Sequence, residues 1–143
     1  MARDLLVVGG GPAGASTAAW AARAGLDVLL VERTVFPRDK ACAEYLSPEA
    51  ARDLDALGVL GDVEAAAVKL TGMRVVADDG SEMLGRFSAS GGFEAYRPYG
   101  LALPRSRLDA IVLEGAARAG AEIRQGVALE ALAIDLFGPL HLE

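Results

Sequence analysis

Residues 4–33 read DLLVVGGGPAGASTAAWAARAGLDVLLVER, and they carry the strongest structural signal in the chain. The short apolar run at residues 5–8 predicts a strand buried on both faces, followed by a glycine-rich turn. Pro12 suits the first position of the next helix, which is expected to run to about Arg23. A second apolar run at residues 28–31 predicts another strand. This order predicts a βαβ unit with two parallel strands.

The glycine-rich turn has the spacing Gly9-x-Gly11-x-x-Gly14. Gly9 permits a tight turn, Gly11 lets a pyrophosphate approach the backbone, and Gly14 lets the helix pack closely on the strand. Glu32 follows at the distance where a carboxylate accepts hydrogen bonds from an adenosine ribose. The pattern therefore predicts dinucleotide binding, without separating NAD from FAD. Glu32 disfavours the 2′-phosphate of NADP, although the neighbouring Arg33 offsets part of that repulsion.

Further elements are expected after this unit. Residues 34–46 are predicted to be irregular, and residues 47–57 to form a helix capped by a Ser-Pro pair. Residues 70–77 and 82–87 flank an Asp-Asp-Gly-Ser turn, which predicts a hairpin. Another strand is expected at residues 99–103, after a loop that contains tyrosine and glycine.

The most regular helical pattern begins near residue 106. Apolar and small residues from Leu108 to Ala119 recur at spacings of three and four, so they share one face. Ser106 is the expected N-cap, and Asp109 would complete a variant of the capping box. Residues 121–134 are expected to add one strand or two.

Together these patterns predict an α/β fold of the Rossmann-like FAD/NAD(P)-binding type. Its parallel sheet is expected from residues 4–33 and about 99–134. The hairpin at 69–87 would belong to a second, substrate-side sheet layer. The domain is expected to span residues 1–134, and residues 135–143 form an atypical tail.

Composition excludes several other classes of function. Of the 143 residues 52% are hydrophobic, which predicts a packed core, and the net charge of −6 argues against a nucleic-acid partner. Cys42 is the single cysteine and cannot form an intrachain disulfide, as expected of a cytoplasmic protein. No metal-ligand spacing occurs, and no stretch is long and apolar enough to predict a transmembrane segment.

Three segments carry a resemblance to a known family: DLLVVGGGPAGASTA, VERTVFPRDKACAEYLSPEA and LALPRSRLDAIVLEGAARAGAEIRQGV. They resemble FAD-dependent oxidoreductases of the p-hydroxybenzoate hydroxylase fold, and most of all the geranylgeranyl reductase-like branch. The resemblance runs from about residue 3 to residue 132. A second flavin-binding signature of that family, a Gly-Asp segment, does not occur in these 143 residues. We therefore expect the N-terminal part of a longer flavoprotein.

The resemblance implies FAD as the cofactor and assigns roles to particular residues. Those near the FAD pyrophosphate and adenosine ribose would be Gly9, Gly11, Ala13, Gly14, Glu32 and Arg33. Residues 38–48 would pass near the isoalloxazine ring, with Cys42 and Ala43 closest. Arg105 would contact the flavin side of the cofactor, and Val127 would lie against the adenine.

The implied activity is reduction of a hydrophobic or isoprenoid-type substrate, with NAD(P)H as the electron donor. A flavin-dependent aromatic monooxygenase or halogenase is the first alternative. The second is a non-catalytic dinucleotide-binding module that self-associates into a homo-oligomer through exposed apolar faces. Peripheral contact with a membrane stays open. No general acid or base is identified, and the single His141 lies in the tail.

Overall fold

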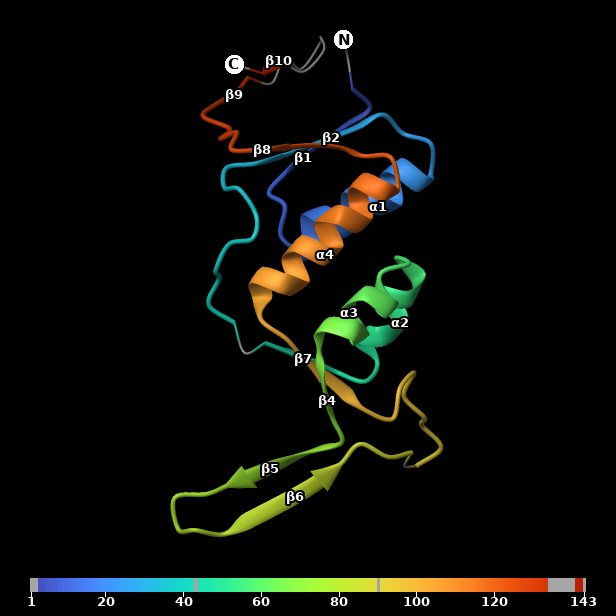
Figure 1. Ribbon diagram of the computed structural model, residues 1–143, viewed down its shortest axis with the longest axis vertical. Coiled ribbons are helices and arrows are strands. Elements are labelled where there is room, and N and C mark those ends of the chain that lie inside the picture. The colour runs from blue at the N-terminus through green and yellow to red at the C-terminus, as the bar shows by residue number, and fades with distance from the viewer. Residues whose placement is uncertain (1–2, 43, 90, 134–140, 143) are drawn as a thin grey trace.

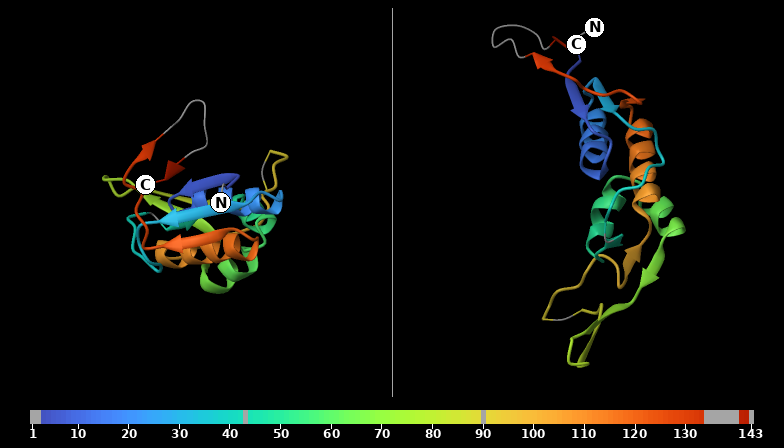
Figure 2. Two further views of the ribbon diagram at one scale, coloured as in Figure 1. Left: turned by 90° about the horizontal axis from the view of Figure 1, so that it is seen from above. Right: turned by 90° about the vertical axis from the view of Figure 1, so that its left-hand side faces the viewer.

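The computed structural model describes residues 3–42, 44–89, 91–133 and 141–142. Its central feature is a three-stranded parallel sheet in the order β1 (Leu5–Val8), β2 (Val28–Glu32) and β8 (Glu122–Gln125). Helices α1 (Pro12–Arg23) and α4 (Arg105–Arg118) lie together on one face of this sheet (Figures 1 and 2). The α/β class with a parallel sheet is therefore confirmed.

Burial differs between the two strands of the βαβ unit. All five residues of β2 are buried, as expected for the central strand of the sheet. In β1 only Val7 is buried, and Val8 is 55% exposed. The prediction that β1 is buried on both faces is wrong, because β1 is an edge strand in the described part of the chain.

Helix α1 packs through small side chains. Ala15, Ala18 and Ala19 are buried, so the helix lies close to the sheet and to α4. Trp20 of the same helix is half-exposed, with the Arg23 guanidinium 5.4 Å from its ring centroid. After the helix, Gly25 takes a φ of +87°, the left-handed backbone that glycine favours.

A second sheet lies beyond the helices and is antiparallel. Its order is β3 (Tyr45–Leu46), β7 (Gly100–Ala102) and β4 (Val68–Leu70). Two expectations are corrected here: β7 does not join the parallel sheet, and residues 34–46 are not irregular throughout. The apolar pattern of β7 predicts a strand but not its partner, because strand pairing is set by contacts between residues far apart in sequence.

The connection between β3 and β4 contains two short helices, α2 (Ala50–Ala56) and α3 (Leu60–Ala66). Sequence analysis predicted the first and missed the second. Gly58, with a φ of +69°, separates them, and Val63 of α3 is fully buried in the core. Among the described residues, no helix has the length and apolar character needed to cross a membrane.

The predicted hairpin is present as β5 (Gly72–Val76) and β6 (Glu82–Arg86), a separate two-stranded antiparallel sheet. It projects from the end of the molecule opposite the parallel sheet (Figure 1). Near the other end, β9 (Leu132–Ala133) pairs antiparallel with β10 (His141–Leu142). Residues 121–134, expected to add one strand or two, contain β8 and the two-residue β9 in their described part.

The start of α4 also differs from the prediction. Pro104 occupies the N-cap position, Arg105 begins the helix, and the Arg105 N–H donates to the Glu44 carboxylate at 3.3 Å rather than to a capping side chain of Ser106. The capping box built on Ser106 is therefore wrong. Asp109 is instead fully buried, and its carboxylate binds the guanidinium of Arg105 one turn earlier.

Candidate dinucleotide site

The glycine-rich turn joins β1 to α1 in a conformation that needs its glycines. Gly9 has a φ of +102°, and its N–H donates to the Val31 carbonyl at 2.8 Å. A Cβ on Gly14 would lie 2.0 Å from the Gly9 carbonyl oxygen and 3.2 Å from Val7 Cγ1. The turn and the strand thus approach the helix more closely than any side chain at Gly14 would allow.

Helix α1 begins directly after this turn. Pro12 occupies its first turn, which contains no acidic residue and has no side-chain cap. The free N–H groups and the helix dipole therefore present partial positive charge at Gly11, Ala13 and Gly14. Such a helix start is suited to an anionic group such as a pyrophosphate.

Glu32 ends β2 beside the turn and is only 6% exposed. One carboxylate oxygen accepts the Gly10 N–H at 2.8 Å, and the other accepts the Thr34 N–H at 3.0 Å and the Thr34 hydroxyl at 2.7 Å. Burial favours the neutral acid, but these hydrogen bonds and the positive charge of Arg38 outweigh it, so the pKa of Glu32 lies below its ordinary value. The carboxylate is ionised and already oriented.

A cavity of about 360 Å³ opens next to Glu32, which we call the adenosine-side cavity. The Val127 N–H donates to the Glu32 backbone carbonyl at 3.0 Å and brings the segment after β8 to this edge. Residues predicted from three separate parts of the chain meet here. The lining residues are Val8, Gly9, Val31, Glu32, Arg33, Val127, Ala128 and Leu129.

A second cavity of about 200 Å³, the flavin-side cavity, lies at the other end of the turn. Gly9 lines the first cavity and Pro12 the second, so the turn bridges them. Cys42 and Arg105, both predicted from sequence, line this second cavity, whereas Ala43 lies outside the described residues. The remaining lining residues are Glu44, Tyr45, Leu46, Leu103 and Leu108.

A charged cluster lies behind the flavin-side cavity. The Arg105 guanidinium donates to both oxygens of Asp109, at 2.7 and 3.1 Å, and Arg38 Nη1 lies 3.3 Å from the same carboxylate. The ion pair with Asp109, followed by the interaction with Cys42, raises the pKa of Arg105. Sequence reasoning did not assign this role to Arg38 or Asp109. The two-arginine, one-acid pattern becomes visible only when residues far apart in sequence are brought together.

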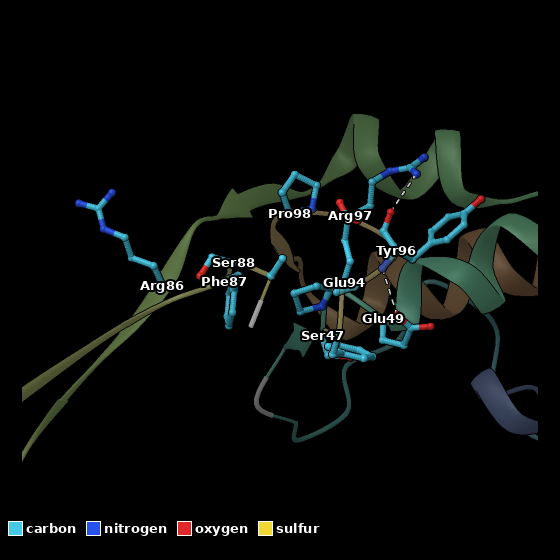
Figure 3. Close-up of a pocket in the computed structure, with 13 residues that line it drawn as sticks. Ser47, Glu49, Arg86, Phe87, Ser88, Glu94, Tyr96, Arg97 and Pro98 are labelled. Atoms are coloured by element: carbon cyan, nitrogen blue, oxygen red, sulfur yellow. Dashed lines mark hydrogen bonds between the residues drawn. The ribbon is translucent and has the colours of Figure 1, made fainter. Parts of the chain in front are cut away.

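The largest of the cavities described here, about 430 Å³, lies nearer the hairpin and has an aromatic and proline-containing wall (Figure 3). Figure 3 shows Phe87 and Ser88, which follow β6, together with Ser47 and Glu49, which precede α2, among the residues that line this cavity. The Tyr96 N–H donates to the Glu49 carboxylate at 3.0 Å. The wall also includes Pro48, Phe93, Arg97 and Pro98.

The cavity of about 430 Å³, which we call the aromatic cavity, adjoins the flavin-side cavity through one ring pair. Tyr45 lines the flavin-side cavity, Phe87 lines the aromatic cavity, and their rings stack with centroids 6.2 Å apart. A Cβ on Gly100 would lie 2.7 Å from the Tyr45 ring and 3.3 Å from the Phe87 ring. Glycine at this position therefore lets the two rings meet.

The sequence model of the FAD binding domain family matches residues 2–138. The chain belongs to this family. It is 39% identical over 123 residues to menaquinone reductase of Mycobacterium tuberculosis, covering 86% of this chain and 29% of that protein. It is 35% identical over 125 residues to digeranylgeranylglycerophospholipid reductase of Methanosarcina acetivorans, covering 85% of this chain and 28% of that protein.

Among solved structures, p-nitrophenol 4-monooxygenase of Pseudomonas putida superposes with a TM-score of 0.81 at 26% identity. The superposition covers 94% of this chain and 34% of that one. This chain therefore spans less than a third of the length of the curated relatives named above. The expected α/β flavoprotein fold and the resemblance to the reductase branch are both confirmed.

The described residues fit the ADP half of FAD. Chain neighbours aside, Arg38 Nη2 is the only atom of the described residues that a Cβ on Gly11 would meet within 4 Å, at 3.7 Å. The ionised, buried carboxylate of Glu32 lies beside the adenosine-side cavity. Among the described residues, no cluster of histidine, cysteine or acidic side chains could hold a metal ion.

Proposed function

We propose that this chain is the cofactor-binding part of an FAD-dependent oxidoreductase that reduces a hydrophobic, isoprenoid-type substrate. The observation that carries the proposal is the bridging turn, with a cavity of about 360 Å³ lined by Glu32 at one end and an arginine-lined cavity at the other. Relatives at 39% and 35% identity are reductases, which supports reduction as the reaction. FAD, when bound, supplies the hydride chemistry, and NAD(P)H is the proposed electron donor.

Each predicted site residue has a proposed role in holding the cofactor. The N–H groups at Gly11, Ala13 and Gly14 bind the pyrophosphate, and Glu32 accepts hydrogen bonds from the ribose hydroxyls. Gly9 shapes the turn, and Arg33 and Val127 line the adenine end. Cys42 and Arg105, which line the flavin-side cavity, are proposed to lie toward the isoalloxazine. The resemblance assigns Ala43 to the same place, and Ala43 lies outside the described residues.

The apolar part of the substrate is proposed to bind in the aromatic cavity near the hairpin. This cavity is lined mainly by apolar surface and shares the Tyr45–Phe87 ring pair with the flavin-side cavity. A substrate there would lie one ring pair from the residues assigned to the flavin. The hairpin at 69–87 is accordingly assigned to the substrate side.

A cytoplasmic location is proposed because the chain contains a single cysteine.

Aromatic hydroxylation is the second candidate, and the solved monooxygenase at a TM-score of 0.81 favours it. The two reactions differ in their use of oxygen. NAD(P)H oxidation that proceeds under nitrogen with an isoprenoid quinone as acceptor supports the reductase, and oxidation that requires air supports the oxygenase.

Substitution of Gly11 tests the cofactor site without disturbing the fold. In Gly11→Ala the new methyl group makes an ordinary contact with Arg38, so the expected loss of stability is only that of replacing a glycine at the N-cap of α1. The methyl would block close approach of a pyrophosphate, and we expect FAD affinity to fall by about 1–3 kcal/mol, the scale of a strained or lost charge-assisted hydrogen bond. Titration of FAD fluorescence measures this change. Equal affinity in the variant would place the cofactor elsewhere.

A further inference from the structure

We propose that Glu64 is a positioning residue for the aromatic cavity, and that it fixes the cavity wall at residues 94–98 through Arg97. The inference rests on the proposed function, which places the apolar part of the substrate, its isoprenoid tail, in this cavity. Glu64 lies on α3 and is not among the residues that line the cavity. Its effect on the substrate is therefore indirect and concerns the tail alone.

The wall at residues 94–98 needs support from side chains, because it belongs to no helix or strand. All of these residues line the cavity. The Tyr96 N–H donates to the Glu49 carboxylate at 3.0 Å, just before α2, and the Tyr96 hydroxyl donates to Asp55 within α2 (Figure 3). Contacts of this kind therefore set the shape of the wall.

Glu64 supplies the corresponding contacts from α3. One oxygen of its carboxylate accepts hydrogen bonds from the Tyr99 hydroxyl at 2.8 Å and from Arg97 Nε at 3.0 Å. The Lys69 ammonium lies 4.5 Å from the centroid of the Tyr99 ring. The hydrogen bonds from Tyr99 and Arg97 outweigh the effect of partial burial, so the pKa of Glu64 lies below its ordinary value. The ionised carboxylate thus holds the chain on both sides of Pro98.

Arg97 connects this carboxylate to the cavity. Its guanidinium carbon lies 4.8 Å from the centroid of the Tyr96 ring, and the guanidinium carbon of Arg52 lies 5.0 Å from the same centroid. A cation over an aromatic face is attracted by the ring quadrupole. Tyr96 therefore contacts two arginines, and Glu64 positions one of them. Loss of Glu64 would release Arg97, and with it one of the supports of the Tyr96 ring.

The test separates the tail of a ligand from its head on the full chain. Menadione, menadione that carries a geranyl tail, and ADP are titrated by calorimetry into wild type and Glu64→Ala. We expect the variant to bind the tailed quinone about three- to ten-fold more weakly, the scale of one hydrogen bond, and menadione and ADP equally well. Asp62→Ala is the matched control, because it removes another ion-paired carboxylate of α3, bound to Arg118, and should change no affinity.

A double-mutant cycle shows whether these contacts act as one unit. Tyr99→Phe removes the second hydrogen bond to Glu64 and leaves the residues that line the cavity unchanged. Tyr99→Phe/Glu64→Ala should bind the tailed quinone no more weakly than Glu64→Ala alone. If Glu64→Ala does not fold, Tyr99→Phe is the test by itself and should weaken binding of the tailed quinone.

Four outcomes would overturn the inference. They are unchanged affinity for the tailed quinone in the folded Glu64→Ala or Tyr99→Phe variant, an equal loss for ADP, an equal loss in Asp62→Ala, and losses that add in the double variant. A wild-type chain that binds FAD but binds the tailed quinone no better than menadione would overturn the proposed tail site as well. A wild-type chain that binds neither FAD nor ADP would overturn the proposed function itself.

Discussion

Glu32 connects the fold to the site at the scale of a single residue. Its carboxylate holds Gly10 of the turn and Thr34 of the following segment, while its backbone carbonyl accepts the Val127 N–H. A carboxylate offers about four lone-pair sites, so acceptor capacity remains for a ribose. The same side chain therefore shapes the turn and faces the ligand.

The hydrogen bonds to Glu32 make stability depend on pH. Because the folded-state pKa lies below the ordinary value of 4.5, the ionised carboxylate stabilises the fold above that pH, and this contribution is lost as pH falls through the folded pKa. Glu32→Gln should lower the free energy of unfolding by about 1–3 kcal/mol at neutral pH. Urea unfolding at a series of pH values measures the difference between variant and wild type.

That difference should shrink as the pH falls below 4.5, because wild type then also loses the charge. Glu114→Gln, an exposed carboxylate on α4, is the control and should have little effect at any pH. A difference for Glu32→Gln that stays constant far below 4.5 would mean that the hydrogen bonds do not depend on ionisation.

At the scale of residues, sequence analysis predicted which residues meet when they lie within one short segment of the chain. The spacing of Gly9, Gly14 and Glu32 lies within one βαβ unit, and the structure brings these residues together as expected. Arg38 and Asp109 could not be recognised, because they meet only after α4 packs beside α1. Asp109 was wrongly assigned to a capping box because it lies three residues after Ser106. Its contact with Arg38 cannot be seen in the sequence.

The glycine turn and α1 depend on close backbone approach at the scale of elements. Gly14→Ala would place a methyl group 2.0 Å from the Gly9 carbonyl oxygen, so backbone must shift. We expect a loss of about 1–3 kcal/mol of stability, typical of overpacking, together with loss of FAD binding. Thermal unfolding followed by circular dichroism measures the change.

Gly61→Ala is the matched control within α3. A Cβ there would meet nothing within 4 Å, and alanine favours a helix. This variant should gain about 0.4–1 kcal/mol. Equal effects of the two substitutions would show that close packing at Gly14 is not what makes glycine necessary there.

Elements with strong periodicity were predictable, and the short ones were not. The apolar runs of β1 and β2 and the regular face of α4 predicted strands and helix near their observed bounds. Helix α3 has only seven residues, and β3 has only two. Segments this short carry too few residues to show a period, and tertiary packing sets their conformation.

At the scale of the whole molecule, the β5–β6 hairpin is the part that burial stabilises least. All five residues of β6 are exposed, including Leu84 at 69%, and a lone two-stranded sheet is marginal in water. Figure 2 shows the hairpin at one end of an elongated molecule, away from the parallel sheet. Its apolar side chains are the proposed surface for self-association: Met73, Val75, Val76, Met83 and Leu84.

Sedimentation equilibrium tests this surface. The apparent mass of the wild-type chain should rise with concentration, because exposed apolar strand edges pair readily. Val75 lies opposite Met83 across the hairpin, so Val75→Glu/Met83→Lys replaces an apolar pair with a salt bridge and should abolish the rise. Leu26→Lys, which changes an exposed leucine after α1, should leave the rise intact. A monomeric wild-type chain at all concentrations would contradict self-association.

The most direct test of the central claim is a titration of the purified chain with FAD, followed by flavin fluorescence and repeated with excess ADP. The bridging turn and the ionised Glu32 predict saturable binding of one FAD per chain, which ADP displaces because both ligands share the same phosphates and ribose. A folded chain that shows no saturable binding, or binding that ADP does not displace, would contradict the assignment of this turn as the cofactor site.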